Sequence, residues 1–151
     1  VYHTDTYGEL PERLAAEVPA LKVQHLHLGK YISFRDEVRM IDVARAMESA
    51  VNSLMSPGET FAAITHSTGG PVVRTWWHRF YLERGRACPM THAIHLAAAH
   101  AGSALAQLGK GKLGRIKSFV ESIEPGEGIL DWLELGSQES LALQQDWVRH
   151  T

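Results

Sequence analysis

The stretch FAAITHSTGGPVVR, residues 61–74, constrains the fold more than any other part of the sequence. A short apolar run ends at a serine, Ser67, and two glycines and a proline follow almost at once. An apolar run bounded by turn residues is typical of a buried strand, and proline suits the first turn of a helix. The sequence therefore predicts a strand, a sharp turn at Ser67 and a helix, the unit from which parallel sheets are built.

The segments on either side repeat this alternation. We expect helices over residues 11–18, 36–55 and 71–84, and strands over residues 23–28, 60–65 and 92–98. This order predicts the α/β fold class, with a mostly parallel sheet flanked by helices in a three-layer sandwich. After the last strand the pattern changes to glycines and short helical pieces, so we expect residues 104–151 to form a cap over one end of the sheet or a long crossover.

Length, charge and cysteine content narrow the class of protein. A chain of 151 residues with 44% apolar and 21% charged residues is sufficient for one domain with a core. The formal net charge of −2 predicts no nucleic-acid partner and no attraction to a membrane through bulk charge. The single cysteine, Cys88, excludes an internal disulfide framework.

Targeting signals are not visible in the sequence. It contains no apolar run of transmembrane length and no signal-peptide pattern. Because residues 1 and 2 already fit the end of a strand, we expect that a native start, and any targeting segment with it, lies before Val1. The localisation and the oligomeric state are therefore left open.

The turn at Ser67 has the context of a nucleophile elbow, in which a strand delivers a serine to a sharp turn before a helix. Such a turn needs small residues two positions before and after the serine. Gly69 fits the pattern G-x-S-x-G, and Thr65 replaces its first glycine. We expect Ser67 Oγ to attack an acyl carbon and the N–H of Thr68 to stabilise the oxyanion. The alternative is a non-catalytic α/β binding domain in which Ser67 caps the helix.

A second motif follows the next strand, at residues 94–106, IHLAAAHAGSALA. Together with THSTGG, it resembles the bacterial lipase and phospholipase branch of the α/β-hydrolase superfamily, where this strand leads into a segment such as L-A-x-P-x-x-G-S-x-L-A. The residues shared with that segment are Leu96, Gly102, Ser103, Leu105 and Ala106, and Ala99 stands in place of the proline. Residues 107–110 and 124–132 are similar too, and the resemblance covers residues 55–147. It implies a serine hydrolase that cleaves carboxylic esters of lipids or phospholipids through an acyl-enzyme on Ser67, without a cofactor.

The resemblance also implies the order serine, acid, histidine along the chain. After the last predicted strand, no further strand ends in an aspartate or a histidine, so we expect both partners beyond Thr151. Residues 1–151 are then expected to be a single α/β-hydrolase-like domain, truncated at both ends, with an incomplete core. The loop with His3 and Thr4 is expected to supply a second oxyanion N–H. If the chain is complete, His100 is the best internal candidate for the base; otherwise we expect it to be structural.

Three other groups of side chains have a structural and a functional interpretation. His25 and His27 share one face of a predicted strand, but a third ligand at a recognisable spacing is missing, so no metal site is predicted. The aromatic residues of segment 76–81 are expected in the core, with an acyl-binding or membrane-facing patch as the alternative. The basic residues of segment 110–117 are expected on a solvated loop, with contact to a phosphate head group as the alternative.

Overall fold

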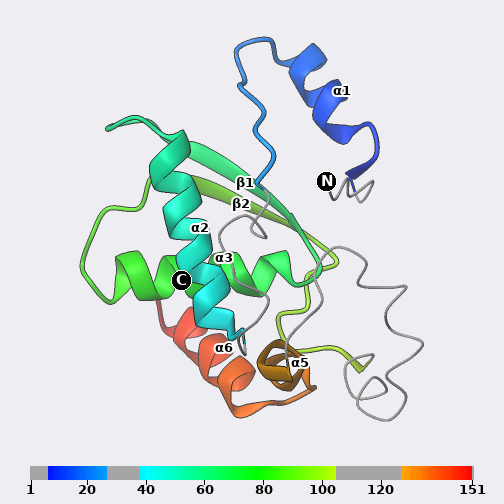
Figure 1. The fold of residues 1–151 in the computed structure, drawn as a ribbon, viewed down its shortest axis with the longest axis vertical. Helices are drawn as coiled ribbons and strands as arrows, with labels where there is room; N and C mark the ends of the chain where they lie inside the picture. The colour runs from blue at the N-terminus through cyan, green and yellow to red at the C-terminus, as the bar shows by residue number, and fades with distance from the viewer. Residues whose placement is uncertain (1–6, 27–37, 105–126, 151) are drawn as a thin grey trace.

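The computed structural model describes residues 7–26, 38–104 and 127–150 (Figure 1). In chain order the elements are α1 (Leu10–Glu17), α2 (Met40–Leu54), β1 (Phe61–His66), α3 (Gly69–Trp77), the π-helix η3 (His78–Leu82), β2 (Met90–Leu96), α5 (Glu127–Leu133) and α6 (Gln138–His150). The three predicted helices and the two predicted strands on either side of Ser67 are thus confirmed, with ends shifted by a few residues.

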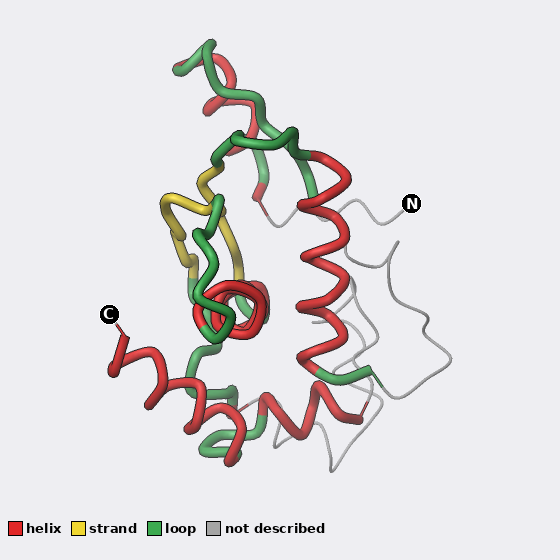
Figure 2. The backbone as a smooth tube through the Cα atoms, turned by 90° about the vertical axis from the view of Figure 1, so that its left-hand side faces the viewer, coloured by secondary structure: helices red, strands yellow, loops and turns green. Residues whose placement is uncertain are grey.

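β1 and β2 form a two-stranded parallel sheet, and α3 and η3 connect them as one βαβ unit. The register pairs Thr65 with His95 and His66 with Leu96, so both strands end at the same edge of the sheet. α3 packs against both strands, and α2 packs on α3. Figure 2 shows α3 nearly end-on beside the strands, and α2 runs in roughly the same direction as the strands. The prediction of parallel strands flanked by helices is therefore confirmed.

One face of this sheet packs against helices, and side chains on the other face are more exposed. Phe61, Ala63 and Ala93 pack into the core on the face that meets α3. On the other face, Ile94 is 50% exposed and Leu96 is 39% exposed. The described residues thus place α2 and α3 on one face of the two strands, and the three-layer sandwich stays a prediction.

The core lies between α2, α3 and the sheet. Trp76 is fully buried, and its Nε1–H donates to Glu48 Oε2 at 2.7 Å; the Tyr81 hydroxyl donates to the same oxygen at 3.1 Å. The Trp76 and Tyr81 rings also meet edge to face, 4.8 Å apart. The predicted core position of these aromatic residues is confirmed for Trp76 and Tyr81, and Trp77 and Phe80 pack partly buried against the core.

Two predicted elements differ from the structure. The strand predicted over residues 23–28 is wrong for the part that the structure describes, because a strand exists only through backbone pairing and the described sheet contains β1 and β2 alone. The helix predicted over residues 71–84 changes into the π-helix at His78, where the N–H of Glu83 donates to the His78 carbonyl five residues earlier (2.9 Å). Gly85 follows the end of this helix, with a left-handed φ of 59°.

The last two helices return to the first half of the chain. α6 packs against α3, and α5 packs against α2. The N–H of Ser103, beyond β2, donates to the Leu133 carbonyl at the end of α5 (2.7 Å). No helix within the described ranges is long and apolar enough to cross a membrane.

Several predicted positions lie outside the described residues. They are His3, Thr4, His27, Lys110, Lys112, Arg115 and Lys117.

Candidate active site

Ser67 lies at the turn between β1 and α3, and its backbone has a φ of 51°. This is the left-handed region, which costs a residue other than glycine about 1–2 kcal/mol. Among the non-glycine residues of the described ranges, only Ser67 and Ala97 have a positive φ, and each directly follows a strand. Strained backbone of this kind concentrates at functional sites. The sharp turn that the sequence predicts at Ser67 is present.

The end of β2 and the residues just after it form hydrogen bonds with both backbone groups of Ser67. The N–H of Ser67 donates to the Leu96 carbonyl at 3.1 Å. The carbonyl of Ser67 accepts from the N–H of Ala99 at 3.1 Å and from the N–H of Gly70 at 3.3 Å. These bonds fix a backbone conformation that a serine alone would avoid. The turn also lies at the carboxyl ends of the strands, where open α/β folds bind their ligands.

Two glycines allow α3 to begin this close to the strands. A Cβ on Gly70 would lie 2.5 Å from the Cβ of Ala98 and 2.9 Å from the Cε1 of His100, which is closer than carbon atoms approach. A Cβ on Gly69 would lie 3.2 Å from the Cβ of Thr65. The packing of the turn therefore excludes a side chain at Gly70 and leaves little space for one at Gly69.

Thr68, and not Ser67, occupies the N-cap position of α3, and no side-chain hydrogen bond caps the helix. This finding argues against the alternative in which Ser67 is a helix cap. No backbone carbonyl of the described residues accepts from the N–H of Thr68. The N-terminus of a helix also carries a partial positive charge. The N–H of Thr68 is therefore suited to an oxyanion, and its role stays a prediction.

Tyr7, shortly before α1, contacts the strand that delivers the serine. The hydroxyl of Tyr7 donates to the Ile64 carbonyl of β1 at 3.5 Å. Burial raises the pKa of Tyr7, and a hydrogen bond with the His66 backbone opposes this effect. His3 and Thr4 lie outside the described residues, so the second oxyanion N–H stays a prediction.

His100 follows β2 and packs under the first turn of α3, against Gly70. Burial, and then the charges of Arg74 and His95, lower the pKa of His100 to about 4. Its Nδ1 is buried and has no hydrogen-bond partner in the described part of the chain. A ring with so low a pKa is a weak proton acceptor at neutral pH. These properties favour the structural role of His100 over the role of a base.

Arg74 supplies the positive charge beside these histidines, and it is only 4% exposed. Its Nη1 donates to Gln144 Oε1 at 3.0 Å, and its guanidinium lies 4.3 Å from the centroid of the Trp147 ring. Both partners are on α6, so the buried arginine links α6 to α3, the helix that follows the serine. Burial lowers the pKa of Arg74.

Comparison with known proteins bears on this site. The chain matches no protein-family model and no curated protein. It is 49% identical to the solved structure of phospholipase PlaB from Legionella pneumophila, with a TM-score of 0.82, over 100% of this chain and 34% of that chain. The chain is related to a phospholipase. The structure of phospholipase PlaB in complex with thio-NAD gives 43% identity and a TM-score of 0.75, over 100% of this chain and 32% of that one.

This relationship confirms the resemblance to the phospholipase branch of the α/β-hydrolase superfamily that THSTGG and residues 94–106 predict. The chain spans about a third of the length of that phospholipase. The activity and the substrates of the whole protein are therefore matters for proposal.

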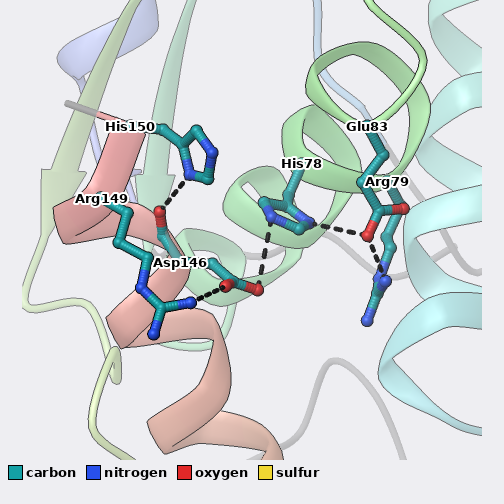
Figure 3. Close-up of polar contacts among 6 residues, drawn as sticks. All are labelled: His78, Arg79, Glu83, Asp146, Arg149 and His150. Carbon is teal, nitrogen blue, oxygen red and sulfur yellow. Dashed lines mark hydrogen bonds and ion pairs between the residues drawn. The ribbon is translucent and has the colours of Figure 1, made fainter.

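A second polar group links α6 to η3 (Figure 3). His78 is buried between two carboxylates: its Nδ1 lies 3.4 Å from Glu83, and its Nε2 lies 3.4 Å from Asp146. Arg79 pairs with Glu83, and Arg149 lies 3.9 Å from Asp146. No motif spacing in the sequence indicates this group, because its members come from separate helices.

The histidines of the N-terminal segment form no site that the structure describes. His25 lies in an exposed, irregular part of the chain, and not on a strand. Within the residues that the structure describes, no group of three or more His, Cys, Asp or Glu side chains could hold a metal ion.

Proposed function

We propose that the chain carries the nucleophile elbow of a serine hydrolase that cleaves lipid or phospholipid acyl esters. The observation that carries this proposal is the left-handed backbone of Ser67 between β1 and α3. A helix cap normally has an extended backbone. An elbow, in contrast, needs the strained turn to lift the hydroxyl clear of the sheet. The relationship to a phospholipase supports a phospholipid acyl ester as the substrate class.

The chemistry follows from the positions of Ser67 and Thr68. Ser67 Oγ bonds to the acyl carbon, its proton passes to a base, and the carbonyl electron pair moves onto oxygen. The N–H of Thr68 donates to this oxyanion, and one such donor is worth about 3 kcal/mol of barrier. The ester C–O bond then breaks, and the alcohol leaves with the proton from the base. Water attacks the acyl-enzyme in the same way and releases the carboxylic acid.

The remaining catalytic groups stay predictions. The base and its orienting acid are expected beyond Thr151, and a second oxyanion N–H is expected from the loop with His3 and Thr4. His100 is less suited to be the base, because its pKa is lowered to about 4.

Covalent labelling with a fluorophosphonate tests the proposal on the protein in its native length. We expect one adduct, located on Ser67 by mass spectrometry, and no adduct in Ser67→Ala. Ser103→Ala is the matched control, since Ser103 follows the neighbouring strand in the chain and should label like the wild type. The wild type, but not Ser67→Ala, should also release fatty acid from phospholipid vesicles. Absence of an adduct on Ser67 would refute the proposal.

A further inference from the structure

The residue two positions before Ser67 packs against the residue two positions after it. Thr65 is 7% exposed, and a Cβ on Gly69 would lie 3.2 Å from its Cβ and 3.8 Å from its Cγ2. The side chain that replaces the usual elbow glycine therefore fills the space that Gly69 leaves free. Thr65 is thus part of the packing of the turn.

The adjacent strand binds the hydroxyl of Thr65. Thr65 and His95 face each other in the register of β1 and β2, and Thr65 Oγ1 is hydrogen-bonded to His95 Nδ1 at 2.6 Å. Side-chain pairs across strands stabilise the pairing in addition to the backbone bonds. This bond therefore fixes the end of β1 against β2, two residues before the serine.

The ring of His95 also packs against a second histidine ring, that of His100. It meets the His100 ring edge to face, with 4.7 Å between the centroids and 83° between the planes. Burial and the charge of Arg74 lower the pKa of His95 and so favour the neutral ring, which has one N–H and one acceptor nitrogen. His100 packs in turn under Gly70. The contacts thus run from β1 through two histidines to the first turn of α3.

We propose that His95 is a positioning residue for the nucleophile and that it acts through Thr65. The inference rests on the function proposed above for Ser67. The bond between Thr65 and His95 links the last residues of β1 to β2. The last residue of β2, Leu96, also accepts from the N–H of Ser67, and Ala99, just beyond β2, donates to the Ser67 carbonyl. Without this bond, the end of β1 shifts against β2 and the strained turn presents Oγ less often. A displacement of about 1 Å can lower a rate about 100-fold.

Two pairs of variants separate the hydrogen bond from the shape of each side chain. Thr65→Val keeps the shape and removes the hydroxyl, whereas Thr65→Ser keeps the hydroxyl. His95→Leu removes the ring nitrogens, whereas His95→Asn keeps a polar atom near the place of Nδ1. We expect Thr65→Val and His95→Leu to lower kcat on a phospholipid about tenfold with KM unchanged, because only the presentation of the nucleophile changes. Thr65→Ser and His95→Asn should keep most of the activity.

The double variant and the labelling rate decide the outcome. Thr65→Val combined with His95→Leu should be no slower than either single variant, because both remove one interaction. The rate of fluorophosphonate labelling of Ser67 should fall with kcat, at a temperature where circular dichroism shows each variant folded. Equal kcat in Thr65→Val and the wild type, or additive losses in the double variant, would overturn the inference. A wild type that is not labelled on Ser67 would refute the function proposed for Ser67 instead.

A folding defect in one variant leaves the test intact. If His95→Leu does not fold, the comparison of Thr65→Val with Thr65→Ser decides alone, since valine and threonine have nearly the same shape.

Discussion

The left-handed backbone of Ser67 predicts a reversal of the usual effect of glycine on stability. Inside a helix or a strand, glycine is less favourable than alanine by about 0.5–1 kcal/mol, because it loses more freedom on folding. At a φ of 51° we expect the opposite, since glycine adopts this region without strain. The test compares Ser67→Gly with Ser67→Ala, two variants that both lack the hydroxyl.

Two opposing contributions set the size of this difference. Relief of the left-handed strain favours glycine by about 1–2 kcal/mol, and the greater backbone entropy of the unfolded chain disfavours it by about 0.4–1 kcal/mol. Ser67→Gly should therefore be more stable than Ser67→Ala by about 0.5–1 kcal/mol. Ala142 offers a matched control on the exposed side of α6, where Ala142→Gly should lower the free energy of unfolding by about 0.5–1 kcal/mol.

Equilibrium unfolding in urea measures these differences, with tryptophan fluorescence and circular dichroism as independent probes. Both Ser67 variants lack the hydroxyl, so its hydrogen bonds do not contribute to the difference in stability between them. If Ser67→Ala proves at least as stable as Ser67→Gly, the left-handed conformation is refuted, and the main support for the elbow is lost with it.

Two further predictions concern the residues under α3. Gly70→Ala places a Cβ 2.5 Å from that of Ala98 and should lower the free energy of unfolding by about 1–3 kcal/mol. The double variant Gly70→Ala with Ala98→Gly should recover part of this loss, and an unchanged urea midpoint in Gly70→Ala would contradict the close packing. Burial, and then the charges of Arg74 and His95, lower the pKa of His100 from 6.5 to about 4. Between these two pH values, the unfolded chain therefore binds more protons than the folded chain. The free energy of unfolding should fall as the pH is lowered through this range. His100→Asn should lose less stability between pH 7 and pH 4 in a series of urea titrations; an equal loss would show that His100 is not the group that titrates.

The strand, turn and helix around Ser67 could be predicted because their signals are local. The apolar run, the serine and the pair Gly69–Gly70 are close together in the sequence, and close packing requires the second of these glycines. The partner of Thr65 could not be predicted in this way. His95 is 30 residues away, and its place opposite Thr65 depends on the register of two strands. A histidine in an alternating strand has the same local pattern whether it faces water or a hydroxyl.

The burial of Arg74 and the irregular residues 23–26 have the same explanation. Arg74 is buried because Gln144 and Trp147 reach it from α6, which follows far along the chain. Residues 23–26 have the alternation of a strand, but alternation becomes a strand only where a neighbour pairs with its backbone. In both cases the outcome depends on segments that are distant in the sequence.

The π-helix η3 lets one carboxylate bind two aromatic residues. In a regular α-helix of about 3.6 residues per turn, side chains five positions apart point in directions about 140° apart. Trp76 and Tyr81 are five positions apart, yet both donate to Glu48 Oε2. The wider turn, closed by the bond from Glu83 to the His78 carbonyl, brings positions five apart toward one side of the helix. The additional residue in this turn is therefore a spacer that allows a single acidic side chain of α2 to anchor the helix that follows the serine.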